Sequence, residues 1–144
     1  MAQPAVAWVA SLSPWPEEFG LDRMRALLAE LGEPQQSFPA IHVVSTNGKS
    51  TTTRLAAALL RSEGLRTGAY TSPHVAGWHE RLDTDAEGFE RAVARVRPAA
   101  ERADATQFEA LTAAALADFA DQGVDAAVVE ARSEEHTSEL QSQR

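Results

Sequence analysis

The stretch HVVSTNGKSTTT, residues 42–53, carries the residue types and spacing best suited to chemistry. A short apolar run leads into Gly48 and Lys49, and four hydroxyl-bearing residues follow. A loop that leaves a strand and opens a helix presents free backbone N–H groups to an anion. Lys49 would add a positive charge for phosphate oxygens, and Ser50 or Thr51 a hydroxyl for phosphate or Mg²⁺. The stretch therefore predicts a nucleotide phosphate-binding loop.

The loop departs from the full Walker A pattern, G-x-x-x-x-G-K-[ST], because Val43 stands where the first glycine belongs. The competing interpretation is a capped helix start, with Asn47 or Ser50 as the N-cap. The strand–loop–helix context favours the phosphate loop.

Hydrophobic periodicity predicts the elements that position this loop. Helical spacing of apolar residues occurs over 21–31, 49–63, 86–103 and 106–122. Short apolar or β-branched runs predict strands over 40–45, 65–72 and 124–131. We expect Leu55, Leu59 and Leu60, with neighbouring alanines, to form the packed face of the helix after the loop. Pro98 is expected to kink or break its helix.

These elements alternate in the manner of a parallel sheet with right-handed crossovers. We therefore predict an α/β fold with helices on both faces of a parallel sheet. Ligands of such sheets bind at the carboxyl ends of the strands. The loop at 45–51, the pair Thr71-Ser72 and Glu130 all fall at such ends.

Composition argues against several kinds of partner and metal site. The 144 residues suffice for one domain, and the net charge of −8 argues against nucleic acid and anionic membranes as partners. The absence of cysteine excludes disulfides and thiolate metal sites. The N-terminus lacks a basic region, and no stretch approaches the roughly 18 apolar residues of a transmembrane helix, so a cytoplasmic protein is expected.

Four segments in order resemble the folylpolyglutamate synthase/dihydrofolate synthase family of the Mur-ligase superfamily. STNGKSTT is similar to that family's G-T-N-G-K-[GST]-[ST] loop, and GLRTGAYTSPHVAGWHERL to its Y-T-S-P-H…N-E-R-[IL] segment. TQFEALTAAAL resembles its T-x-F-E-x-x-T helix, and DAAVVEA its V-x-[LI]-E strand. The resemblance covers residues 8–131, and we interpret residues 1–131 as the N-terminal part of a Mur-ligase-like ATP-binding domain.

The resemblance implies an ATP-dependent ligase that joins L-glutamate to a dihydropteroate or folate carboxylate through an acyl phosphate. It assigns the ATP phosphates to Thr46, Asn47, Gly48, Lys49, Ser50 and Thr51. It assigns Mg²⁺ to Ser72 and Glu130, and hard oxygen ligands from strand ends suit that ion. Lys49 and Glu130 are the residues expected to act in catalysis.

The resemblance also implies a pterin or folate site at Pro16, Glu17, Glu18, Phe19, Arg81, Thr106, Gln107 and Phe108. Alternatives remain for several of these residues. Thr106 and Glu109 fit a capping box, Phe108 could serve only in the core, and Glu80 with Arg81 could form an ordinary surface pair.

The chain departs from the family pattern at three places. Ser45 replaces the first glycine of the loop, His79 replaces an asparagine, and the glycine-rich continuation expected after residue 131 is replaced by RSEEHTSELQSQR. We expect residues 132–144 to be disordered and artefactual, and the chain to be a truncated sheet that is inactive alone.

Two alternatives to this function remain open, another Mur-type amide ligase and a non-catalytic ATP-binding module. The expected partners are ATP, glutamate and a pteroate or folate, and a full-length parent is expected to be a monomer.

Overall fold

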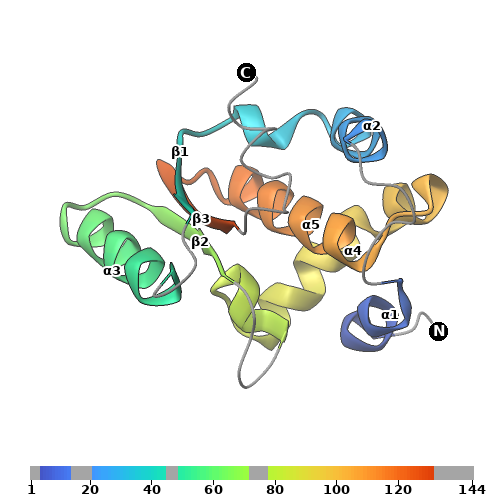
Figure 1. Ribbon diagram of the computed structural model, residues 1–144, viewed down its shortest axis with the longest axis horizontal. Helices are drawn as coiled ribbons and strands as arrows, with labels where there is room; N and C mark the ends of the chain where they lie inside the picture. Colours follow the sequence, from blue (N-terminus) through green and yellow to red (C-terminus); the bar gives the residue numbers. More distant parts are fainter. Residues whose placement is uncertain (1–3, 14–20, 45–48, 72–77, 132–144) are drawn as a thin grey trace.

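The computed structural model describes residues 4–13, 21–44, 49–71 and 78–131. Its helices and strands follow one another as shown in Figure 1. In chain order they are α1 (Ala5–Ser11), α2 (Asp22–Glu30), the 3₁₀ helix η1 (Pro34–Gln36), β1 (Ala40–Val44), α3 (Lys49–Ser62), β2 (Thr67–Tyr70), the 3₁₀ helix η2 (Trp78–Leu82), α4 (Ala86–Ala103), α5 (Gln107–Gln122) and β3 (Ala126–Ala131).

The three strands form one parallel sheet in the order β1-β3-β2. The last strand of the chain therefore lies in the middle, with Ala127 paired to Ala40 on one side and to Gly68 on the other. This arrangement confirms the predicted α/β class. It also brings the carboxyl ends of all three strands to one edge of the sheet.

The main core joins one face of the sheet to α4 and α5, and α1 and α2 pack on those two helices (Figure 1). Helix α5 is its centre, because nearly every residue from Glu109 to Phe119 is buried. A helix that is apolar almost all round belongs in an interior, and the alanine-rich sequence allows its neighbours to approach closely. Phe119 meets Phe38 edge to face, with ring centroids 6.0 Å apart.

The other face of the sheet is covered by α3 (Figure 1), through a small cluster of Ala57, Ala69 and Val128. The prediction for the packed face of this helix was wrong in two of three positions. Leu60 packs against the cluster, but Leu55 and Leu59 are each 59% exposed. They lie about 200° around the helix from Ala57, on the side away from the sheet.

Local capping interactions define where α4 begins and where α5 ends. Asp85 caps α4 by accepting a hydrogen bond from the Gly88 backbone N–H. Gly123 ends α5 in a left-handed conformation with φ of 67°, which glycine adopts readily because it has no Cβ atom. The expected break at Pro98 is absent, since α4 continues through this exposed residue to Ala103.

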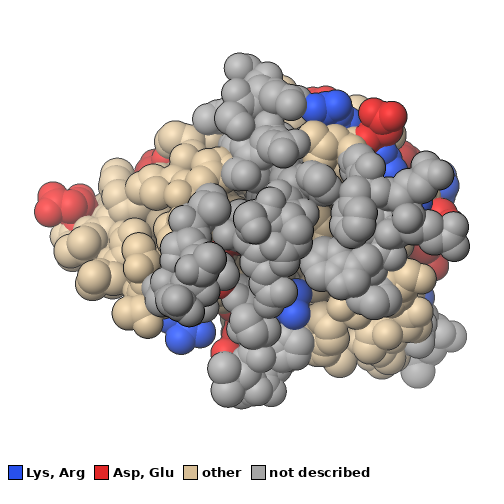
Figure 2. Space-filling view, in the orientation of Figure 1, with Lys and Arg blue, Asp and Glu red and all other residues tan. Residues whose placement is uncertain are grey.

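Sequence periodicity left α1, η1 and η2 unpredicted, because each is short. None of the helices within the described residues is long and apolar enough to cross a membrane. Figure 2 shows scattered Lys or Arg and Asp or Glu side chains among the described residues of one face.

Candidate nucleotide site

The candidate site is the edge of the sheet where the parallel strands end. Glu130 stands near the end of the central strand, opposite Val43 of β1. On its other side the register places Thr71, the residue after β2, because Tyr70 pairs with Val129. Glu130 and Thr71 are both 3% exposed. A carboxylate and a hydroxyl are thus brought together at the point where ligands of parallel sheets bind.

Helix α3 begins at this same edge. It follows β1 after residues 45–48, and Ser62 lies at the opposite end of the sheet, near the start of β2. The first turn of a helix carries backbone N–H groups that have no partner within the helix, together with the positive end of its dipole. The predicted phosphate loop therefore leads into a helix whose geometry suits an anion. Thr51, one of its predicted ligands, is exposed in the first turn.

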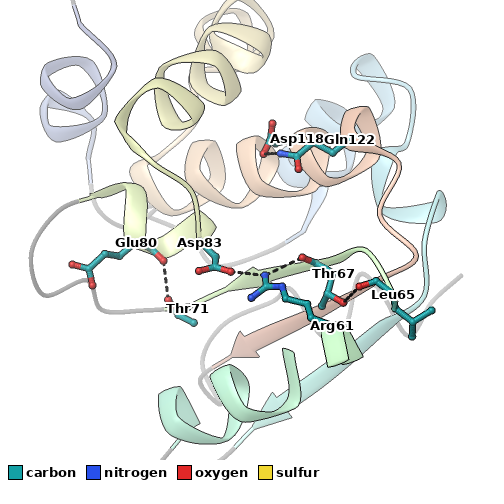
Figure 3. Close-up of polar contacts among 8 residues, drawn as sticks. All are labelled: Arg61, Leu65, Thr67, Thr71, Glu80, Asp83, Asp118 and Gln122. Carbon is teal, nitrogen blue, oxygen red and sulfur yellow. Dashed lines mark hydrogen bonds and ion pairs between the residues drawn. The ribbon is translucent and has the colours of Figure 1, made fainter. Parts of the chain in front are cut away.

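The segment after β2 folds back onto the strand end through two hydrogen bonds of Thr71. Its backbone N–H donates to the Arg81 carbonyl at 2.8 Å, and its hydroxyl donates to the Glu80 carbonyl at 3.1 Å (Figure 3). The end of β2 is thus tied to η2. The predicted Mg²⁺ ligand Ser72 itself lies outside the described residues.

Ion pairs also join η2 and the turn after it to α3. Arg61 contacts the Asp83 carboxylate at 2.6 Å and donates to the Thr67 carbonyl at 3.0 Å (Figure 3), while Arg54 lies 3.9 Å from Glu80. A cavity of about 380 Å³ lies among these side chains, bounded by Ala57, Ala69 and Thr71. Arg81 itself stacks on Trp78, with its guanidinium 5.2 Å from the ring centroid. The predicted substrate contact Arg81 is thus tied into this polar cluster.

The other predicted substrate residues lie at the start of α5. Thr106 and Glu109 form a capping box, which was the alternative interpretation of these residues from the sequence. Arg23 contacts the Glu109 carboxylate at 2.8 Å. Gln107 donates from its backbone to the Ser13 carbonyl at 2.7 Å and from its side chain to the Val9 carbonyl at 3.2 Å. Phe108 is half-buried.

These contacts bring Thr106–Phe108 beside Ser13, the last described residue before the segment that holds Pro16, Glu17, Glu18 and Phe19. The start of α5 therefore lies beside the residue after which the predicted substrate segment begins. Pro16–Phe19 themselves lie outside the described residues, as do Ser45, Thr46, Asn47, Gly48 and the tail 132–144. For Lys49 and Ser50 the structure describes the backbone, as the first residues of α3.

Among the described residues, no group of three or more His, Asp or Glu side chains is arranged to hold a metal ion. Glu130 supplies one hard oxygen ligand at the strand ends, and Mg²⁺ needs only one or two protein carboxylates because it keeps several waters. Ser72, the other predicted ligand, would supply a hydroxyl oxygen.

Sequence reasoning missed Thr53, Arg54 and Arg61, which all lie on α3. Thr53 is fully buried, and its Oγ1 has no hydrogen-bond partner among the described residues. The signal that could have found it is its spacing, because Thr53, Ala57 and Leu60 repeat at helical intervals. Because Thr53 is polar, the pattern of apolar residues indicated the leucines instead.

The chain is similar in sequence and fold to several known proteins. The dihydrofolate synthase/folylpolyglutamate synthase of Mycobacterium tuberculosis is 37% identical over 137 residues, covering 81% of this chain and 28% of the relative. The folylpolyglutamate synthase of Lacticaseibacillus casei is 39% identical over 120 residues, covering 75% of this chain and 28% of the relative. A folylpolyglutamate synthase solved as a complex with AMPPCP and folate superimposes with a TM-score of 0.81 at 36% identity, covering 88% of this chain and 34% of that one.

This chain is a relative of the folylpolyglutamate and dihydrofolate synthases. Both the sequence and the fold carry the relationship, which bears out the resemblance of the four motifs. The chain matches no protein-family model. It spans about a third or less of the length of these folylpolyglutamate synthase relatives.

Proposed function

We propose that this chain carries the nucleotide-binding part of an ATP-dependent ligase that joins L-glutamate to a dihydropteroate or (tetrahydro)folate carboxylate. One observation carries the proposal: the buried Glu130 stands at the carboxyl end of the central strand, between the ends of β1 and β2. Ligands of parallel sheets bind at this edge, so a carboxylate there is well placed to hold a cation beside a nucleotide. The name and bound ligands of the folylpolyglutamate synthase complex support the assignment of nucleotide and folate.

Each part of the chain has a task in this proposal. The ATP phosphates are bound by Thr46, Asn47 and Gly48, which precede α3, and by Lys49, Ser50 and Thr51 in its first turn. Lys49 neutralises charge on the transferred phosphoryl group, which is the main contribution a protein makes to phosphoryl transfer. Glu130 and Ser72 would hold Mg²⁺, which when bound shields phosphate charge. The γ-phosphoryl group passes to the substrate carboxylate, and the glutamate amine then displaces phosphate.

The start of α5 and residues 16–19 are proposed to bind the pterin or folate. Helix α5 is fixed there by the Thr106 capping box and by Gln107 on α1, so its first turn can present Phe108 on a rigid support. Thr106 and Gln107 already make hydrogen bonds within the fold. Their predicted contacts with the substrate must therefore form in addition to these bonds. Phe108 is the residue whose half-exposed ring best suits stacking.

A nucleotide titration tests the proposal. We expect the purified 144-residue chain to bind ATP by isothermal titration calorimetry, with Mg²⁺ strengthening the binding. Glu130→Gln should abolish much of the Mg²⁺ effect, whereas Glu63→Gln, at an exposed carboxylate near the end of α3, should leave it unchanged. An equal effect of the two substitutions, or no ATP binding by wild type, would contradict the site.

A second assay addresses the reaction. Glutamate-dependent ADP release is measured with dihydropteroate or tetrahydrofolate as acceptor. Because the chain spans about a third or less of its folylpolyglutamate synthase relatives, we propose that it binds nucleotide but does not turn over alone. Turnover with a cell-wall precursor and not with either pterin substrate, in a protein of the relatives' full length, would instead favour another amide ligase.

A further inference from the structure

A buried hydroxyl with no partner lies directly under the candidate site. Thr53 is 0% exposed, and its Oγ1 makes no hydrogen bond with any described part of the chain. A threonine inside a helix ordinarily donates to the carbonyl three or four residues before it. That bond is missing here, although the helix backbone from Lys49 onward is described. A buried polar group without a partner is unfavourable, and a native protein keeps few of them.

The packing of α3 on the sheet shows what Thr53 faces. Helix α3 runs antiparallel to the strands, and Ala57 packs on Val128 and Ala69 in the small cluster. One helical turn towards the amino end, about 5.4 Å, leads from Ala57 to Thr53. Two residues towards the carboxyl end of β3, about 6.6 Å, lead from Val128 to Glu130. The two steps run in the same direction, so Thr53 and Glu130 occupy the next layer of the interface.

The same step along β2 leads from Ala69 to Thr71. This layer therefore contains three polar side chains, all at most 3% exposed, where the layer before it is wholly apolar. The Thr71 hydroxyl is already committed to the Glu80 carbonyl. Of the two hydroxyls in the layer, Thr53 is the one without a described partner.

We infer that Thr53 is a positioning residue for Glu130, and that its hydroxyl donates to the Glu130 carboxylate when Mg²⁺ and ATP are bound. This inference rests on the proposed function. A carboxylate has more acceptor positions than one metal uses, and carboxylates that bind metals are commonly held by a second hydrogen bond. Loss of such a bond typically weakens metal binding by about 10–100-fold.

The test separates this role from a structural one. Thr53→Val keeps the shape of the side chain and removes the hydroxyl, and Thr53→Ser keeps the hydroxyl. Thr53→Ala is a second variant without a hydroxyl, should valine not be accommodated. Thr52→Val is the matched control, because Thr52 is the exposed neighbour on the same helix. Each 144-residue variant is titrated with Mg²⁺ at saturating ATP by calorimetry, and its unliganded melting temperature is recorded.

We expect Thr53→Val or Thr53→Ala to weaken Mg²⁺ binding at least about tenfold while the melting temperature of the unliganded chain stays the same or rises. Thr53→Ser and Thr52→Val should bind Mg²⁺ as wild type does. Wild-type Mg²⁺ affinity in the hydroxyl-free variants overturns the inference, whether or not they melt earlier. If wild type binds ATP and Mg²⁺, that result leaves the proposed function intact; if wild type binds neither, both proposals fall.

Discussion

A strand backbone approaches an aromatic ring closely at Gly68 in β2. A Cβ atom added there would lie 2.6–2.8 Å from three ring carbons of Phe119. Contacts this short require one partner to move. Phe119 is 2% exposed and is held edge to face against Phe38, so its ring has little room to retreat. Gly68 is thus required by the close approach of a strand backbone to an aromatic ring, rather than by a turn.

Gly68→Ala should therefore destabilise the protein. Overpacking of a filled core costs about 1–3 kcal/mol, and the clash with a fixed ring favours the upper half of that range. For a chain of this size a loss of about 2–3 kcal/mol lowers the melting temperature by roughly 4–12 °C. Urea unfolding monitored by circular dichroism measures the free energy directly, and an unchanged slope confirms that the folded state is retained.

A double-mutant cycle with Phe119→Leu identifies the cause. The leucine removes the ring atoms that the new methyl group meets, so Gly68→Ala should cost at least about 1 kcal/mol less in the Phe119→Leu background than in wild type. Additive effects of the two substitutions would refute the reasoning, because they would show that the ring does not limit the space at residue 68.

Three further predictions concern other parts of the fold. Burial raises the pKa of the Asp118 carboxyl, against the opposing effects of Arg91 and a hydrogen bond from Gln122. The protonated carboxyl therefore stabilises the folded state below about pH 4. This stabilisation is lost as the pH rises through the raised pKa. Asp118→Asn should accordingly gain stability relative to wild type between pH 4 and 7, and an advantage in urea unfolding that shrinks with pH would contradict this. Thr106→Ala removes the N-cap of α5 and should cost about 1 kcal/mol, with Thr106→Ser close to wild type; equal losses would mean that the hydroxyl does not matter. Leu59→Ala should change the free energy of unfolding by less than about 0.5 kcal/mol, whereas Leu116→Ala, at a fully buried position, should cost about 2–5 kcal/mol, and similar costs would refute the exposed placement of Leu59.

The sequence predicted the sheet because its strands and its last helix have strong local signals. The runs around Val43, Ala69 and Val128 each end at a polar residue or a turn, and the long apolar segment from Phe108 to Phe119 can only be an interior helix. The central place of β3 could not be read from local patterns, since strand order depends on contacts between distant segments. Short elements such as α1 and η2 carry too few periodic residues to be distinguished from loops.

The site was predictable to the extent that it follows strand ends. Glu130 could be placed because a carboxylate directly after an apolar strand marks the edge of the sheet. The contacts of η2 could not be predicted, because Arg61 and Asp83 lie 22 residues apart and meet only in three dimensions. Thr106 shows a different limit: the same residues satisfy both a capping box and a family motif, and spacing alone cannot divide the two roles.

Helix α3 shows why size misled the prediction of its packed face. Leu55 and Leu59 are the larger apolar residues, yet the side that meets the sheet is formed by Thr53, Ala57 and part of Leu60. Small side chains let the helix lie close to the strands, so its first turn is brought down to the level of Glu130. Bulky residues at positions 53 and 57 would lift the helix away from the sheet and separate the first turn of α3, the proposed phosphate-binding turn, from the strand ends. We infer that the narrow apolar stripe of α3 keeps this proposed turn close to Glu130.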